Sequence, residues 1–500
     1  MLLATFISLT RAEGDPTGTK TGTVADVPAA KSGEPTLSEL ADALGHSRIA
    51  LNIVWTLITG FLVMFMQAGF AMVETGFTRA KNVAHTMGMN FLVYAIGVVG
   101  FWVCGFAFMF GGVGAVAALG GTPGLSGEFA IELFGKTFGL VGTNGFFLNN
   151  SVYDVGIYTL FLFQMVFMDT TATIPTGAMA ERWKFVSFVV YAFFISMIVY
   201  PIFGNWVWGG GWLAALGTNF GLGHGHVDFA GSSVVHMVGG IAALAGALVL
   251  GPRIGKYNKD GTSNAIPGHN IPMAIIGTFI LAFGWFGFNP GSTLAGNDLR
   301  IAVVATNTML ASAAGALVAT ITMWLKFKKP DPSMMANGML AGLVAITAPC
   351  AFVSAPAAVL IGAVAGYLVV AAVFIIDHRV RVDDPVGAVA VHGVNGCWGV
   401  LSLGIFADGS YGEGWNGVSG TVRGLLYGDP GQFVAELIGC VVCFAFVFGT
   451  MYGFFKLSDR LFGIRVAEKD EIEGLDLPEM GIKGYEETPA VAREYAPAQY

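Results

Sequence analysis

Two histidines stand at matching positions of an internal repeat. The run from Asp228 to Gly240 aligns without a gap with the run from Asp384 to Gly396, and this alignment pairs His236 with His392. Each run opens an apolar segment, and a histidine inside a membrane is costly and therefore usually functional. Imidazole can accept and pass on protons at either ring nitrogen. The pair therefore predicts a functional site at the interface of the two repeats, and structural packing and axial ligation of a haem are the alternative roles for two such histidines.

The composition places these histidines in a membrane. Of the 500 residues, 54% are hydrophobic and 12% are charged, whereas ordinary soluble domains carry about 25% charged residues. We therefore expect an all-α polytopic membrane protein in contact with lipid. The net charge of −8 comes largely from the two polar ends and does not indicate a nucleic-acid partner. Nucleophile motifs, phosphate-binding glycine loops and metal-ligand spacings are not evident, so we expect no enzyme activity, no metal and no other cofactor.

Eleven apolar segments are candidates for transmembrane helices, since a bilayer core about 30 Å thick requires roughly 20 apolar residues per helix. They lie near residues 50–75, 88–115, 154–180, 184–204, 228–251, 271–289, 301–325, 335–352, 355–376, 386–406 and 432–456. Residues 47–465 should form the membrane domain, and residues 117–152 a longer polar excursion. Residues 1–46 should form an outer polar segment, whose first ten residues resemble a weak signal peptide. Residues 466–500 should form a cytoplasmic tail with a disordered end.

Basic residues predict the orientation of the chain. The loops that follow odd-numbered segments carry most of them: Arg79, Lys81, Arg182, Lys184, Arg253, Lys256, Lys259, Lys326, Lys328, Lys329, Arg379, Arg381, Arg460 and Arg465. The loops that follow even-numbered segments carry only Lys136, Arg300 and Arg423. By the positive-inside rule, the N-terminus should lie outside the cell membrane and the C-terminus in the cytoplasm.

The repeat predicts two halves of opposite orientation. Its motif returns after five segments, an odd number, so the two copies enter the membrane from opposite faces. Asp228 and Asp384 should cap the starts of their helices, and each histidine then lies about 12 Å deeper. We expect a 5+5 inverted repeat, about 50–251 and 271–406, with the eleventh helix outside it. Transporters of this architecture bind their substrate near the midplane.

Four motifs carry a resemblance to a known family. They are Asp228-Phe-Ala-Gly-Ser-Ser-Val-Val-His236, Gly284-Trp-Phe-Gly-Phe288-Asn-Pro-Gly-Ser292, Phe163-Gln-Met-Val-Phe167 and Trp208-Gly-Gly-Gly211. Taken in their order along the chain, within a similarity that spans roughly residues 50–476, they resemble the ammonium transporter (Amt/Mep/Rh) family. The resemblance implies a function for several side chains. Phe163, Phe167, Trp208 and Ser292 would recruit ammonium, Phe167 and Phe288 would form a gate, His236 and His392 would line the pore, and Asp228, with Asp384 as its counterpart, would organise the site.

The residue types suit such a function. Aromatic faces attract a desolvated cation by about 2 kcal/mol, and a serine oxygen can accept a hydrogen bond that ammonium offers and potassium does not. An apolar constriction disfavours an ion far more than neutral ammonia. We therefore expect recruitment of ammonium, deprotonation at the gate, and passage of ammonia with a separately relayed proton. An ammonium sensor of the same fold and a haem-binding membrane oxidoreductase are the alternatives.

Several residues depart from the family pattern or remain open. Gly387 stands where the family usually has an acidic residue, and Asp169 is an intramembrane acid with either a structural or a proton-related role. His224 and His226 fall in an external loop that we expect to be solvated. The resemblance further implies a homotrimer. The segment Glu473-Gly-Leu-Asp476 suggests docking of a PII-type regulatory protein, although the His-Gly that usually follows is absent.

Overall fold

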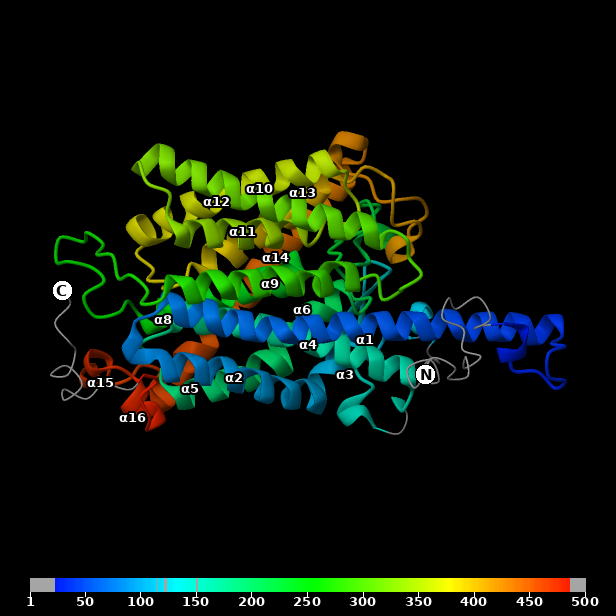
Figure 1. The fold of residues 1–500 in the computed structure, drawn as a ribbon, viewed down its shortest axis with the longest axis horizontal. Coiled ribbons are helices and arrows are strands. Elements are labelled where there is room, and N and C mark those ends of the chain that lie inside the picture. Colours follow the sequence, from blue (N-terminus) through cyan, green and yellow to red (C-terminus); the bar gives the residue numbers. More distant parts are fainter. Residues whose placement is uncertain (1–22, 115, 121–123, 150–151, 486–500) are drawn as a thin grey trace, which may run out of the picture.

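The chain folds into a bundle of long helices in this computed structural model (Figure 1), which describes residues 23–114, 116–120, 124–149 and 152–485. The longest α-helices are α1 (Leu37–Phe77), α2 (Val83–Gly100), α4 (Val155–Met179), α9 (Ile271–Gly291), α10 (Ile301–Phe327), α12 (Ala355–Ile375) and α14 (Pro430–Phe462). The shorter ones are α3 (Phe106–Phe110), α5 (Phe185–Phe194), α6 (Tyr200–Val207), α7 (Leu216–Phe220), α8 (Val238–Leu250), α11 (Pro332–Ile346), α13 (Asn395–Phe406), α15 (Glu468–Glu473) and α16 (Asp476–Met480).

Ten helical segments among the described residues are long and apolar enough to cross a membrane. The multi-pass helical architecture is therefore confirmed, but the count of eleven is not. The expected segment 335–352 corresponds to α11, which ends at Ile346 and is followed by turns. Its 15 residues span about 22 Å at 1.5 Å per residue, less than the apolar thickness of a bilayer. In Figure 1, α1 begins at one end of the bundle and α14 leads to α15 and α16 at the other.

The first helix begins earlier than its hydrophobicity predicts. We expected a span from residue 50, preceded by a polar segment, whereas α1 starts at Leu37 and extends beyond the bundle (Figure 1). Thr36 accepts a hydrogen bond from the backbone N–H of Glu39, whose carboxylate bonds back to Thr36. This reciprocal capping box is a strong start signal that does not depend on hydrophobicity. The expected signal peptide and the end of the tail lie outside the described residues.

The polar excursion contains the one element that is not helical within the described part of the chain. Strands β1 (Glu128–Leu133) and β2 (Lys136–Gly142) pair antiparallel, with Leu133 opposite Lys136 across the turn. The backbone N–H of Trp212 bonds to the carbonyl of Gly139, so the hairpin is attached to the segment that follows α6. The expected all-α fold therefore carries a small β-hairpin next to the segment that follows α6.

Both copies of the repeat motif start their helices in the same unusual way. The backbone φ is +121° at Gly231 and +82° at Gly387, a region that favours glycine because it lacks a Cβ atom. Each glycine is followed by a π-helical turn, Ser232–Met237 in one copy and Val389–Val394 in the other. The departure at Gly387 thus has a backbone explanation, because the matched glycine of the first copy also has a positive φ.

Glycines also let the two copies cross closely. A Cβ atom at Gly240 would lie 2.1 Å from the backbone nitrogen of Gly393, and one at Gly396 would lie 2.4 Å from the carbonyl oxygen of Ser232. Any side chain at these matched positions would force the helices apart. Gly240 thus lets the π-helical turn of the second copy pack against α8. Gly396 lets the π-helical turn of the first copy pack against α13.

The basic loops predicted to share one face do meet at one end of the bundle. Arg253 pairs with Asp383, with Nε 2.9 Å from Oδ2, and with Glu181, with Nη1 3.2 Å from Oε1. Arg79 also binds Glu181. Burial alone would raise the pKa of Asp383, but the guanidinium groups of Arg182 and Arg253 hold it well below its usual range. This network joins loops that are far apart in sequence.

Candidate functional site

Four aromatic rings form a continuous file through the middle of the bundle, which we call the ring column: Phe167, Phe288, His236 and His392. Phe167 and Phe288 are stacked with centroids 4.1 Å apart. Phe288 stacks on His236 at 5.4 Å, and His236 on His392 at 5.2 Å. At most 5% of any of these side chains is exposed. The sequence predicted all four as gate and pore residues, and the structure brings them together.

The two histidines share a hydrogen bond. Nδ1 of His236 lies 3.1 Å from Nδ1 of His392, so one nitrogen must carry a hydrogen and the other must accept it. This contact leaves no room for an iron ion between the facing nitrogens and argues against axial haem ligation. Nε2 of His236 has no hydrogen-bond partner among the described residues. The pair can therefore exchange a proton through Nδ1 while each ring keeps a second nitrogen.

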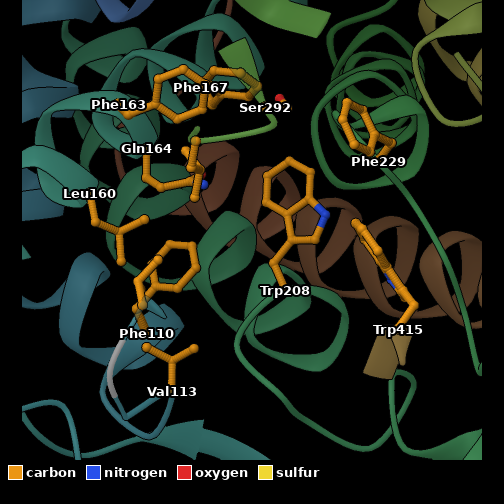
Figure 2. Close-up of a pocket in the computed structure, with 12 residues that line it drawn as sticks. Phe110, Val113, Leu160, Phe163, Gln164, Phe167, Trp208, Phe229, Ser292 and Trp415 are labelled. Carbon is orange, nitrogen blue, oxygen red and sulfur yellow. The ribbon is translucent and has the colours of Figure 1, made fainter. Parts of the chain in front are cut away.

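An outer cavity of about 220 Å³ opens above the ring column (Figure 2). It is lined by Phe110, Val113, Val116, Leu160, Phe163, Gln164, Phe167, Trp208, Phe229, Ser292, Leu294 and Trp415. All four residues predicted for recruitment are among them. Phe163 and Phe167 lie one turn apart on α4 with ring centroids 4.7 Å apart, and Phe167 thus forms both a wall of this cavity and the top of the ring column.

Hydrogen bonds orient the polar groups of the outer cavity. The indole N–H of Trp208 donates to the carbonyl oxygen of Asp228 at 2.6 Å, which fixes the ring. The Ser292 hydroxyl donates to the carbonyl oxygen of Phe288 at 2.7 Å. Because the serine hydrogen is used in this bond, the lone pairs of its oxygen remain available to accept an N–H. The site combines aromatic faces with one oriented acceptor.

Asp228 fixes the start of its helix through five hydrogen bonds. Oδ1 accepts the backbone N–H groups of Gly231 and Ser232, and Oδ2 accepts those of Ser233 and Val234 together with the Ser233 hydroxyl, all within 3.0 Å. Its match, Asp384, accepts three backbone N–H groups and is only partly buried. Both acids therefore accept N–H groups at the starts of their helices, as predicted, but the helices begin later than expected, after Gly231 and Ala388.

Several residues that line the outer cavity were not predicted from the sequence, among them Gln164, Phe229 and Trp415. Gln164 adjoins Phe163 in a quoted motif, and its buried Oε1 has no partner among the described residues. Phe229 follows Asp228 directly. Trp415 comes from the loop after α13, lies 6.1 Å from Phe229 between ring centroids, and faces the cavity opposite Gln164 (Figure 2). The first two could have been found by extending the motifs by one residue, but no local pattern marks Trp415.

A smaller inner cavity of about 20 Å³ lies at the other end of the ring column. It is lined by Phe70, Val73, Glu74, Ile174, Leu281, Asn337, Leu340, Val386, Ala388, Val391 and His392. His392 therefore ends the ring column at this cavity, as Phe167 does at the outer one. Between the two cavities the path is filled by aromatic rings.

The prediction that His224 and His226 lie in a solvated loop is wrong. Their side chains are 4% and 0% exposed, because loop and helix residues from the second half of the chain cover them. Nδ1 of His226 lies 2.6 Å from Oε2 of Glu436, and Nε2 lies 2.9 Å from the Ser233 hydroxyl, which donates to Asp228. A chain of polar contacts thus runs from α14 to the acid beneath the outer cavity.

The contact with Glu436 should make stability depend on pH. Burial lowers the pKa of His226, but the adjacent Glu436 carboxylate outweighs this effect, and the pKa is raised overall. The folded protein then holds this proton more tightly than the unfolded chain, whose histidine has a pKa of about 6.5. The stabilisation is complete below that value and is lost as pH rises through the higher folded pKa. We expect the melting temperature of the purified protein to fall over this range. A Glu436→Gln variant should show a flatter profile, and equal slopes in both proteins would contradict this account.

Two other predicted features lie apart from the ring column. Asp169 is 2% exposed and its Oδ1 has no partner among the described residues, but it lines neither cavity. The tail packs onto the loops at the inner end: Lys81 donates to the Glu471 carbonyl, and Asp476 accepts the backbone N–H of His85. The described part of the tail thus contacts the loop between α1 and α2 and the start of α2.

The sequence and the fold of this chain are similar to those of known proteins. Residues 54–485 match the model of the ammonium transporter family. Ammonium transporter Amt2 of Archaeoglobus fulgidus is 47% identical over 464 residues, which are 92% of each chain. Among solved structures, a protein described as sensor Amt protein has a TM-score of 0.75 at 36% identity, covering 87% of this chain and 100% of its own. Mep2 of Candida albicans has a TM-score of 0.70 at 26% identity, covering 84% and 87%.

Proposed function

This chain belongs to the ammonium transporter family, and on that premise we propose that it recruits ammonium at the outer cavity, deprotonates it, and conducts ammonia along the ring column while the proton travels through His236 and His392. Multi-pass membrane transport of ammonium, rather than an enzyme reaction, is its function. The single observation that supports the finer mechanism is the hydrogen-bonded histidine pair, which ends the file of rings between the two cavities.

Recruitment rests on the chemistry of the outer cavity. Trp208, Phe163 and Phe167 offer aromatic faces that attract a cation by about 2 kcal/mol when water is excluded. The Ser292 oxygen and the unpartnered Gln164 Oε1 can each accept an N–H from ammonium. Potassium has a similar charge and size but no hydrogen to donate. The site therefore favours ammonium through its acceptors rather than through its charge.

Permeation rests on the ring column. The rings of Phe167 and Phe288 are stacked with their centroids 4.1 Å apart and offer no polar group to a passing ion. The desolvation of a charged species at this point would therefore be very costly. Neutral ammonia avoids most of this cost. The proton removed from ammonium needs its own acceptor, and the histidine nitrogens below the gate supply one. Separation of ammonia from its proton follows from these two demands.

Orientation and assembly follow from the loop charges and the family. We place the outer cavity outside the cell and the charged end, with the tail, in the cytoplasm, as the excess of basic residues at that end predicts. A homotrimer in the lipid membrane and docking of a PII-type protein at the tail remain proposals for this chain. An ammonium sensor is the second candidate, because one similar structure is described as sensor Amt protein.

The test is the current evoked by ammonium pulses on proteoliposomes adsorbed to a solid support. The wild-type protein should give a current with ammonium and none with potassium. A sensor that binds ammonium without transporting it would give only a brief current from the binding event. Absence of sustained ammonium-driven charge movement in well-folded protein would refute transport by the proposed mechanism.

Ser292→Ala should weaken the preference for ammonium without closing the pore. The substitution removes one hydrogen-bond acceptor, and such a bond contributes about 1 kcal/mol, or roughly a fivefold loss in apparent affinity. The maximal current should stay near its wild-type level. Ser410→Ala, at an exposed loop serine outside the cavity, is the control. An unchanged apparent affinity in Ser292→Ala would exclude the hydroxyl from recruitment.

A further inference from the structure

A buried carboxyl lies at the inner end of the pore, outside the mechanism described so far. Glu74 belongs to α1, three residues before the end of this helix, and is only 2% exposed. A carboxyl within a membrane span is expensive and usually faces a functional cavity. The position of Glu74 fits that rule, because it lines the inner cavity.

Helix α1 aims this carboxyl at the histidine pair. Phe70 contacts His392 with ring centroids 6.1 Å apart, and Glu74 lies one turn further along the same helix face, four residues on. Both residues and His392 line the inner cavity. The inner cavity therefore connects the last imidazole of the ring column with a carboxyl closer to the charged end of the bundle.

The two carboxylate oxygens have different surroundings. Oε2 accepts hydrogen bonds from the Asn90 amide and the Thr176 hydroxyl, both at 2.7 Å. Oε1 lies beside Gly177, where an added Cβ would stand 3.0 Å from it, and 2.5 Å from the side chain of Val386 in the cavity wall. Two neutral donors thus hold Oε2 in place, and Oε1 lies next to Gly177 and to Val386, which lines the inner cavity.

The inner cavity has the size and polarity to hold a water. A volume of about 20 Å³ exceeds the roughly 10–15 Å³ that one water requires, and a buried water needs two to four polar partners. Glu74, Asn337 and His392 are the polar side chains in its lining. Among the described residues, the one hydrogen bond to the His392 ring uses Nδ1, so Nε2 is free to face this water.

Because position 387 is glycine, this chain has no acidic side chain there, and Glu74 is the acid among the residues that line the inner cavity. The family usually has an acidic residue there, and this chain has none. A Cβ at Gly387 would lie 2.9 Å from Nδ2 of Asn337, which lines the inner cavity. An acid at position 387 would therefore sit beside the same cavity that Glu74 reaches from α1. Glu74 supplies a carboxyl to this cavity from a different helix.

We infer that Glu74 is the group that takes the proton from His392 at the inner end of the pore, in place of the acid absent at Gly387. The His392 Nε2–H gives its proton to the water in the inner cavity while that water gives one of its own to Oε1 of Glu74. The imidazole is then neutral, the water is unchanged, and Glu74 is a neutral acid until the proton leaves toward the cytoplasm. This inference rests on the proposed function, because it adds the next step of the same relay.

Glu74→Gln tests the inference, since it keeps the shape of the side chain and removes the proton acceptor. Ammonium-evoked current in proteoliposomes should fall by about tenfold or more, equivalent to about 1.4 kcal/mol in the barrier. Ammonium binding at the outer cavity, followed by tryptophan fluorescence, should be unchanged. Glu74→Asp keeps a carboxyl that the water can still reach and should retain most of the current. Glu128→Gln makes the same change at a half-buried acid of β1 that lines neither cavity, and this control should conduct normally.

The outcomes separate this inference from the proposed function. A wild-type protein without ammonium current would refute the proposed function itself. A conducting wild type with an equally conducting Glu74→Gln would overturn the role of Glu74. Equal losses in Glu74→Asp and Glu74→Gln would also overturn it, because the loss would then follow shape rather than acidity. If Glu74→Gln does not fold, Thr176→Val removes one donor from Oε2 and keeps the carboxyl. The current should then fall severalfold, since the acid releases its proton less readily, and an unchanged current would overturn the inference.

Discussion

Replacement of His236 by leucine should reduce ammonium-evoked current by about tenfold or more, or about 1.4 kcal/mol in the barrier. His236 links Phe288 to His392 within the ring column, at 5.4 Å and 5.2 Å between centroids. Leucine can fill much of this space but cannot accept a proton or bond to Nδ1 of His392. The measurement is current on solid-supported membranes, with ammonium and potassium pulses compared in the same preparation.

Coupling between the two histidines provides the sharper result. His392→Leu should cost about as much as His236→Leu, and the double variant should be little worse than either, because residues that act as one unit are not additive. His378 is exposed and lines neither cavity, so His378→Gln is a control that should conduct normally. Unchanged current and selectivity in His236→Leu would refute the proton relay.

Asp228→Asn should destabilise the protein strongly although the two side chains have the same shape. Oδ2 of Asp228 accepts two backbone N–H groups and the Ser233 hydroxyl. In asparagine an NH₂ group would face these donors, and each buried donor left unpaired costs about 1–3 kcal/mol. We expect a lower melting temperature and a poor yield of folded protein. The indole N–H of Trp208 donates to the backbone carbonyl oxygen of residue 228, so a shift of this backbone would also change the orientation of the Trp208 ring.

Asp384→Asn is the matched comparison for this prediction. Asp384 occupies the same position in the second copy of the repeat but accepts fewer groups and is partly exposed. Water can replace some of its bonds, so the loss of stability should be clearly smaller. Equal melting temperatures for wild type and Asp228→Asn would show that capping by this carboxylate contributes little to the fold.

The sequence alone was sufficient for features that depend on composition and on the spacing of residues along the chain. Low charge and long apolar runs identified a helical membrane protein, and the alternation of basic loops grouped segments that the structure brings to one end. The ungapped motif paired His236 with His392 because a repeat preserves spacing. The capping box at Thr36 was also present in the sequence. The start of α1 was misplaced because the prediction of its bounds used hydrophobicity alone.

Only the tertiary structure decided what depends on contacts between distant residues. Local spacing could bring the two imidazoles to similar depth, but the 3.1 Å bond between them requires the close crossings at Gly240 and Gly396. The contact of His226 with Glu436 joins residues that are more than two hundred positions apart. The juxtaposition of Glu74 with His392 likewise depends on how α1 packs against the second half of the chain. Periodicity reports which face of a helix is apolar, whereas packing determines which side chains that face meets.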